Sequence, residues 1–140
     1  MGNPRLPPVI FFEEKAFVNY LLRQPVKWID GVTYTHLPFA ELPFRKVVCG
    51  KAPTVPLPNV RYIEQVHAKI WIVGCGRQIR VFVGSLNMVY TESWEVIVEV
   101  RDWEDKKKCI ELFRKLWKRA QPVDRAPFYK ECISQNEENL

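Results

Sequence analysis

The chain has 140 residues, 47% of them hydrophobic, which is the size of one domain able to bury a sizeable core. A net charge of +5 at pH 7 favours a polyanionic partner. No stretch is long enough to span a membrane, and the first residues lack the basic start and apolar core of a signal peptide. We therefore expect a cytoplasmic protein without membrane insertion.

The N-terminal part predicts an extended arm, a helix and a strand. Three prolines keep residues 1–12 extended. A helix is expected over Glu13–Arg23, where apolar residues recur on one face and Pro25 follows. Val26–Thr35 has the composition of a strand, in which Asp30-Gly31 indicates a hairpin or a bulge.

Prolines dominate the next part of the chain. Two of them leave Leu37–Phe44 room for at most a short helical turn, and three make Ala52–Asn59 a stiff extended linker. Between them, Lys46–Cys49 is a short apolar strand. The pair Gly50-Lys51 lacks the flanking residues of a phosphate loop, so we interpret it as an ordinary turn.

The central stretch predicts three antiparallel strands in a meander. Val60–Val73 ends in an apolar, β-prone run, and Gly74–Arg77 supplies a turn. Ile79–Val83 is the second strand of this hairpin, and Trp94–Val100 follows as the third.

A C-terminal amphipathic helix is expected over Trp103–Ala120, with Asp102 as its N-cap. One face is apolar and should pack on the sheet. The other face is basic, either as an ordinary solvated surface or as a surface that binds nucleic acid. The candidate nucleic-acid-binding residues on this face are Lys107, Lys115, Lys118 and Arg119. The polar and acidic segment 134–140 is expected to be a flexible tail.

The four cysteines form no CxxC pair, so free thiols are favoured over zinc ligands, and one disulfide is left open. His36 lies at the end of the second predicted element. We favour a structural histidine there over a functional one.

Several polar residues converge where the central hairpin closes. His67 and Lys69 are two positions apart, so both side chains project from the same face of an extended chain. Antiparallel pairing would bring Ser85 and Asn87 beside them, with Glu95 in the third strand. A neutral imidazole is a competent nucleophile near pH 7, while an ammonium, a hydroxyl and an amide can bind phosphate oxygens. This cluster suits attack on a phosphodiester.

The segments His67–Lys69 and Gly84–Asn87, with an acidic residue in the next strand, resemble a half-site of the phospholipase D superfamily. The superfamily pattern is HxK, four residues, Asp, then GSxN. The chain departs from it at Gly74, which stands in the place of the Asp. The resemblance implies an α/β (α+β) fold in a single domain over 1–140: a trimmed phospholipase-D-like mixed sheet flanked by helices.

The resemblance also implies a role for each matching residue. His67 would be the covalent nucleophile, and Glu95 would orient its ring. Phosphate would be bound by Lys69, Asn87 with Ser85, and Gly84. No metal and no cofactor are required by this scheme.

A single half-site implies a homodimer in which two copies of His67 face each other, one attacking and one protonating the leaving oxygen. The expected function is a metal-independent endonuclease acting on nucleic acid, with DNA favoured over RNA. One alternative is a lipid phosphodiesterase or transferase, which would need an apolar groove near His67. Another is an inactive phospholipase-D-like module that binds nucleic acid or serves assembly.

Overall fold

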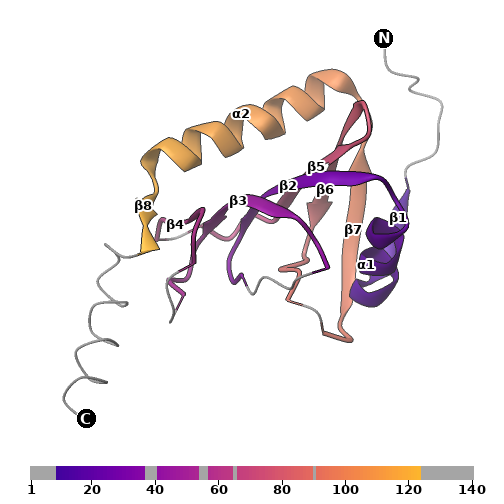
Figure 1. Cartoon of the computed structure of the whole chain (residues 1–140), viewed down its shortest axis with the longest axis horizontal. Helices are drawn as coiled ribbons and strands as arrows, with labels where there is room; N and C mark the ends of the chain where they lie inside the picture. The colour runs from indigo at the N-terminus through magenta and orange to yellow at the C-terminus, as the bar shows by residue number, and fades with distance from the viewer. Residues whose placement is uncertain (1–8, 37–40, 54–56, 65, 90, 124–140) are drawn as a thin grey trace.

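The structure is a computed structural model that describes residues 9–36, 41–53, 57–64, 66–89 and 91–123. Within these residues, eight strands form one mixed sheet in the order β1-β7-β6-β5-β2-β3-β4-β8. Helices α1 (Glu14–Leu22) and α2 (Trp103–Arg119) lie on its two sides (Figure 1). The strands are β1 (Ile10–Glu13), β2 (Val26–Thr33), β3 (Phe44–Cys49), β4 (Val60–Tyr62), β5 (Ile70–Cys75), β6 (Gln78–Gly84), β7 (Trp94–Val100) and β8 (Gln121–Pro122).

The predicted meander and the predicted α+β class are both confirmed. β5, β6 and β7 pair antiparallel in sequence order. β2 pairs antiparallel with the other side of β5, and β3 and β4 continue outward in parallel. As a result β2, β3, β4 and β6 end, and β5 and β7 begin, at the same end of the sheet. We call this the motif end, and it is bounded by Thr33, Cys49, Ile70, Gly84 and Trp94.

Both faces of the sheet are buried at its centre, which explains why β5 is apolar at nearly every position. Trp71 and Val73 belong to the core on the α1 side, and Ile70 and Ile72 to the core on the α2 side. This is the alternation expected of a strand. α2 packs on its face through Phe113, as its apolar stripe predicts.

The two predicted helices are confirmed with small shifts at their ends. α1 begins at Glu14 and ends at Leu22, and α2 ends at Arg119. The Asp102 carboxylate caps α2 by accepting a hydrogen bond from the Asp105 N–H at 3.1 Å. In the part of the chain that the structure describes, no helix is both long and apolar enough to cross a bilayer. Segment 134–140 lies outside the described residues, as do residues 1–8 of the predicted arm.

The structure refines two expectations about local structure. Residues 10–13 are extended as predicted, and they form an edge strand paired with β7. β2 runs through Asp30-Gly31 without a hairpin turn, and the predicted irregularity is a register shift against β3 between Ile29 and Asp30. Gly31 serves packing instead, because a Cβ there would lie 2.3 Å from Cζ3 of Trp71.

The hairpin and the segment before it also differ from the prediction. The turn is Gly76-Arg77, and Gly74 lies inside β5. The predicted long strand over 60–73 is two strands, β4 and β5, which lie on opposite sides of β2 and β3 in the sheet. His67 and Lys69 therefore lie in the segment that leads into β5, rather than in the strand itself.

Candidate active site

His67 lies at the motif end of the sheet and is exposed. Its imidazole stacks on the ring of Tyr34, with centroids 5.0 Å apart and an interplanar angle of 9°. Tyr34 directly follows β2, so the neighbouring strand fixes the ring against which His67 rests. The Lys69 ammonium is half-buried and donates to the His67 carbonyl oxygen at 2.9 Å. The two residues of the HxK segment thus stay together at the entrance to β5.

Asn87 is fixed by the segment that follows β2. Its Oδ1 accepts from Thr33 Oγ1 at 2.9 Å and from the backbone N–H groups of Tyr34 and Thr35 at 3.2 and 3.3 Å. Because Oδ1 is engaged as an acceptor, the amide has only N–H donors to offer a ligand. Donors are what phosphate oxygens require.

Tyr34 joins the two halves of the motif. Its ring contacts His67 of the HxK segment, and its N–H binds Asn87 of the GSxN segment. The Gly84 N–H also donates to the Lys69 carbonyl oxygen at 3.4 Å. The structure therefore brings the HxK and GSxN segments together, although some twenty residues separate them in sequence. They meet at the open end of the hairpin, where antiparallel pairing predicts them.

Gly84 permits a close approach between β6 and β7. With φ at +156°, a Cβ there would lie 1.8 Å from the Val96 carbonyl oxygen. Ser85, the next residue, makes two hydrogen bonds with Val96 of β7. The Ser85 N–H donates to Val96 O at 2.9 Å, and the Val96 N–H donates to Ser85 Oγ at 3.0 Å. Both backbone N–H groups are engaged within the sheet, so phosphate binding through the Gly84 N–H stays a prediction.

Glu95 is held by serines. One carboxylate oxygen accepts from Ser85 Oγ and the other from Ser93 Oγ at 3.1 Å. The ring of His67 packs on Tyr34 instead, so its orientation by Glu95 also stays a prediction. Ser93 in turn donates to Glu14 of α1 at 3.3 Å, which ties the segment before β7 to that helix.

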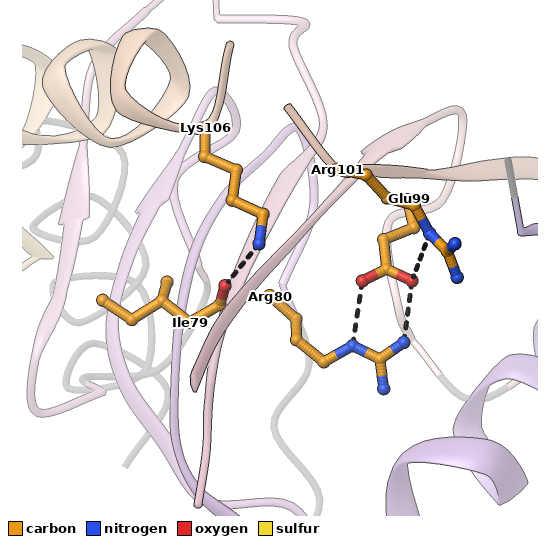
Figure 2. A network of polar contacts seen from close by, with 5 residues as sticks. All are labelled: Ile79, Arg80, Glu99, Arg101 and Lys106. Atoms are coloured by element: carbon orange, nitrogen blue, oxygen red, sulfur yellow. Dashed lines mark hydrogen bonds and ion pairs between the residues drawn. The ribbon is translucent and has the colours of Figure 1, made fainter. Parts of the chain in front are cut away.

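The other two acidic residues near this strand are engaged elsewhere. Glu99 is buried and accepts two hydrogen bonds from Arg80, at 2.9 and 2.7 Å, while Arg101 lies 3.7 Å away (Figure 2). Glu92 is exposed and lies 3.9 Å from Lys15. Glu95 is therefore the acid at the motif end that contacts the GSxN segment.

Gly74, in the place of the superfamily Asp, faces an indole ring. It pairs with Trp28 of β2, and a Cβ on Gly74 would lie 2.2 Å from Trp28 Cε2. The space of the missing side chain is thus filled by tryptophan. The buried carboxylate of Asp30 lies one alternation further along β2 and is engaged by Arg45, with Nε–Oδ1 at 2.9 Å.

A cleft of about 380 Å³ opens beside His67, and none of its other lining residues is among the predicted site residues. It is lined by Tyr34, Gly50, Lys51, Ala52, Tyr62, Glu64 and His67. Burial raises the pKa of Tyr62, and the nearby charges of Glu64 and Tyr34 add to this. Lys51, set aside with Gly50 as an ordinary turn, adds a cation to the lining of this cleft. Spacing gave no signal here, because these residues come from three separate segments.

His36, the second histidine, is buried and neutral. Burial lowers its pKa to about 4. Its ring meets Phe44 edge-on with centroids 4.9 Å apart, and Nδ1 has no hydrogen-bond partner among the described residues. This supports the structural interpretation over a functional one. Nowhere in the described ranges do three or more His, Cys, Asp or Glu side chains gather as they would around a metal ion.

The predicted basic residues of α2 lie on different parts of the helix surface. Lys107 and Lys118 line a groove between α2 and the sheet, whereas Lys115 and Arg119 are exposed and do not line it. Lys107 also lies 3.5 Å from Glu104, one turn earlier in the helix. These four cations therefore form two separate sets.

Comparison with known proteins gives the class of fold. No family model matches the sequence, and no curated protein matches it. Among solved structures, NucT from Helicobacter pylori aligns with a TM-score of 0.59 and 15% identity, over 83% of this chain and 98% of NucT. TrmBL2, an archaeal chromatin protein whose structure shows a novel mode of DNA binding, aligns with a TM-score of 0.52 and 12% identity.

The second alignment covers 86% of this chain but 56% of TrmBL2, so the chain spans little more than half of that protein. At these identities the comparisons establish the fold alone. The chain has the mixed α+β fold expected of a phospholipase-D-like domain, and this fold is similar to that of NucT.

Proposed function

We propose that the protein is a phosphodiesterase that cleaves nucleic acid as an endonuclease, with His67 as the covalent nucleophile. The observation that carries this proposal is the contact of Tyr34 with both His67 and Asn87, which unites an HxK and a GSxN segment at one end of a phospholipase-D-like sheet. The likeness to NucT and to a DNA-binding chromatin protein supports nucleic acid as the substrate class.

The proposed chemistry has a nucleophile in the HxK segment and N–H donors in both segments of the motif. A neutral ring nitrogen of His67 attacks phosphorus, so that a P–N bond forms and the bond to the leaving oxygen breaks. Lys69 and Asn87 bind the non-bridging oxygens, and the Lys69 ammonium offsets their negative charge. Water then attacks the phosphohistidine, which restores the imidazole and releases a phosphate monoester. Glu95 would hold the Ser85 hydroxyl in place throughout.

The leaving oxygen needs a proton, and one half-site supplies one exposed histidine. We propose that a second copy of the chain contributes its own His67 as the general acid, in a homodimeric site. After it protonates the leaving oxygen, this second histidine is neutral and accepts the proton of the attacking water. Side chains of the protein thus handle every proton transfer in the scheme, and no step is assigned to a metal.

The test is cleavage of single- and double-stranded DNA and RNA in excess EDTA. His67→Ala and Lys69→Ala should each lose about 10³-fold or more in rate. Lys108→Ala, which removes an exposed cation from α2, is the matched control and should cut normally. Wild type should also yield an acid-labile, alkali-stable phosphoryl adduct on His67 with an end-labelled substrate. Equal cleavage by all four proteins would contradict the proposal.

A second function is favoured by one observation, the indole of Trp28 in the space of the superfamily Asp at Gly74. A chain that has lost this Asp could bind nucleic acid without cutting it. In that case wild type and His67→Ala would bind oligonucleotides equally, and neither would cut. A lipid substrate is less favoured, because the cleft beside His67 is lined by two tyrosines, a lysine and a glutamate.

A further inference from the structure

A second concave surface lies between α2 and the sheet. It is a groove of about 620 Å³, within the range of sites that hold small ligands or polymer segments. Its floor includes Ile72 of β5 and Ile79 of β6, and Phe113 of α2 closes one side. Two opposed walls, β3 and α2, carry the polar side chains.

Both walls of the groove are positively charged. β3 contributes Arg45 and Lys46. α2 contributes Lys107, Arg114 and Lys118, which recur on one stripe of the helix. Like charges on the two walls repel one another, and an anionic ligand would relieve this repulsion.

Two carboxylates also line the groove, and they do not cancel this charge. Asp30 is buried and accepts from the Arg45 guanidinium, and Glu111 is exposed on α2. Five cations against two anions leave a net formal charge of +3 on the lining. The groove is therefore complementary to a polyanion.

Tryptophans between the cations narrow the choice of polyanion. The Arg45 guanidinium lies over Trp28, with its Cζ 4.0 Å from the centroid of the indole ring. The Arg61 guanidinium lies over Trp117 at the same distance. Trp103, at the start of α2, is 50% exposed and has a free surface on which a base can stack. Cations that follow a backbone, with aromatic rings between them, are the features that bind single-stranded nucleic acid.

We propose that this groove binds a single strand of nucleic acid, with phosphates on the cations of α2 and β3 and a base stacked on Trp103. The strand β5 links the groove to the motif end. Ile72 on the floor is five residues from His67, so their Cα atoms are at most about 18 Å apart. One strand could then occupy both places, and this last step rests on the proposed function.

The test compares two triple variants of the same helix in the His67→Ala background, which keeps the probe intact. The groove variant is Lys107→Gln with Arg114→Gln and Lys118→Gln. The control is Lys108→Gln with Lys115→Gln and Arg119→Gln, which removes the same charge from outside the groove. Fluorescence anisotropy with a labelled single-stranded DNA should show at least tenfold weaker binding for the groove variant and less than threefold for the control.

Salt and stacking give independent readouts. Loss of three phosphate contacts should reduce the log–log salt slope by about 2 for the groove variant, at about 0.7 per contact on a single strand. Trp103→Ala should weaken the binding of single-stranded DNA by about tenfold and leave the binding of duplex DNA unchanged. Circular dichroism checks that each variant is folded.

Several outcomes would overturn the inference. Equal loss in the two triple variants would mean binding by net charge alone. If poly-glutamate displaces the DNA probe as well as unlabelled DNA does at the same concentration of charge, the groove would instead be assigned to an acidic protein. Binding and cleavage are measured separately, so wild type that fails to cut in EDTA refutes the nuclease proposal but leaves the groove intact. Wild type that cuts, with a groove variant that binds normally, refutes only the groove.

Discussion

At the scale of single residues, Tyr34 has the widest influence on the site. Its ring supports the imidazole of His67 and its backbone N–H holds Asn87. Sequence spacing predicted that His67, Lys69 and the GSxN segment would meet, because the hairpin between them is local. It gave no sign of Tyr34, since that contact depends on β2 pairing with β5, and β2 is distant in sequence.

Substitution of Tyr34 separates its two contacts. Tyr34→Phe keeps the stacked ring and the N–H, so single-turnover cleavage should stay within about twofold of wild type. Tyr34→Leu keeps the N–H but loses the stack, and a loosely held nucleophile should slow cleavage by about tenfold. If the ring acts only on stability, Tyr34→Leu will lower the melting temperature. The cleavage rate per folded molecule and its pH profile will then stay unchanged.

His36 predicts a pH dependence of stability. Its pKa is lowered by burial to about 4 in the folded chain, against 6.5 when unfolded. Above pH 6.5 both states are neutral and the residue has no pH effect. As pH falls from 6.5 towards 4 the unfolded state binds a proton that the folded state does not, so stability falls, by about 2 kcal/mol at pH 5.

Urea denaturation at pH 7.5 and pH 5 measures this effect. His36→Phe has no titrating ring, so its loss of stability over the same interval should be smaller by that amount. Equal losses in the two proteins would show that His36 gains its proton without unfolding.

At the scale of elements, β6 and β7 are joined by charge as well as by backbone. Arg80 of β6 and Glu99 of β7 form a two-bond pair on the α1 side, with the Arg80 guanidinium 5.1 Å from the Tyr20 ring (Figure 2). Lys106 of α2 also reaches back to the Ile79 carbonyl oxygen at 3.0 Å. These contacts fix the hairpin that carries both halves of the motif.

Removing one partner of the Arg80–Glu99 ion pair should destabilise the fold more than its share of removing both partners. Glu99→Gln or Arg80→Met alone leaves a buried charge without its partner and should destabilise the fold by about 3 kcal/mol. The double variant removes both charges and should lose less than the two single variants added together. Chemical denaturation of all four proteins measures the coupling, and additive losses would show that the pair contributes little.

Element types could be predicted from the sequence, and element neighbours only partly. The helices and the meander were predicted, because periodicity and turns are local signals. The division of 60–73 into β4 and β5 was not, since it depends on pairing with β3 and β2.

At the scale of the whole molecule, one apolar surface is left open near the motif end. Phe12 of β1 and Trp94 and Val96 of β7 are 58%, 79% and 48% exposed. Trp94 and Val96 alternate with Ile97, which belongs to the α1-side core, so they face the other side of the sheet. Trp94 is the first residue of β7, so this surface begins at the motif end.

The homodimer proposal predicts that this surface is covered in solution. Sedimentation velocity should give twice the mass of the 16.5 kDa chain, and Trp94→Glu should yield a monomer that does not cut. Leu112→Glu introduces the same charge at an exposed apolar residue of α2 and should leave the dimer intact. Full cleavage by a monomeric wild type would contradict a shared site.

The contact between Gly74 and Trp28 restricts how this sequence can evolve. A single change of Gly74 to Asp would drive the new Cβ into the indole, which lies 2.2 Å from that position. Reducing Trp28 first would open a cavity and remove the ring under Arg45. Each step alone lowers stability, so the superfamily pattern can return only when both positions change together. The departure at Gly74 is therefore hard to reverse, and later substitutions must be compatible with the contact between Gly74 and Trp28.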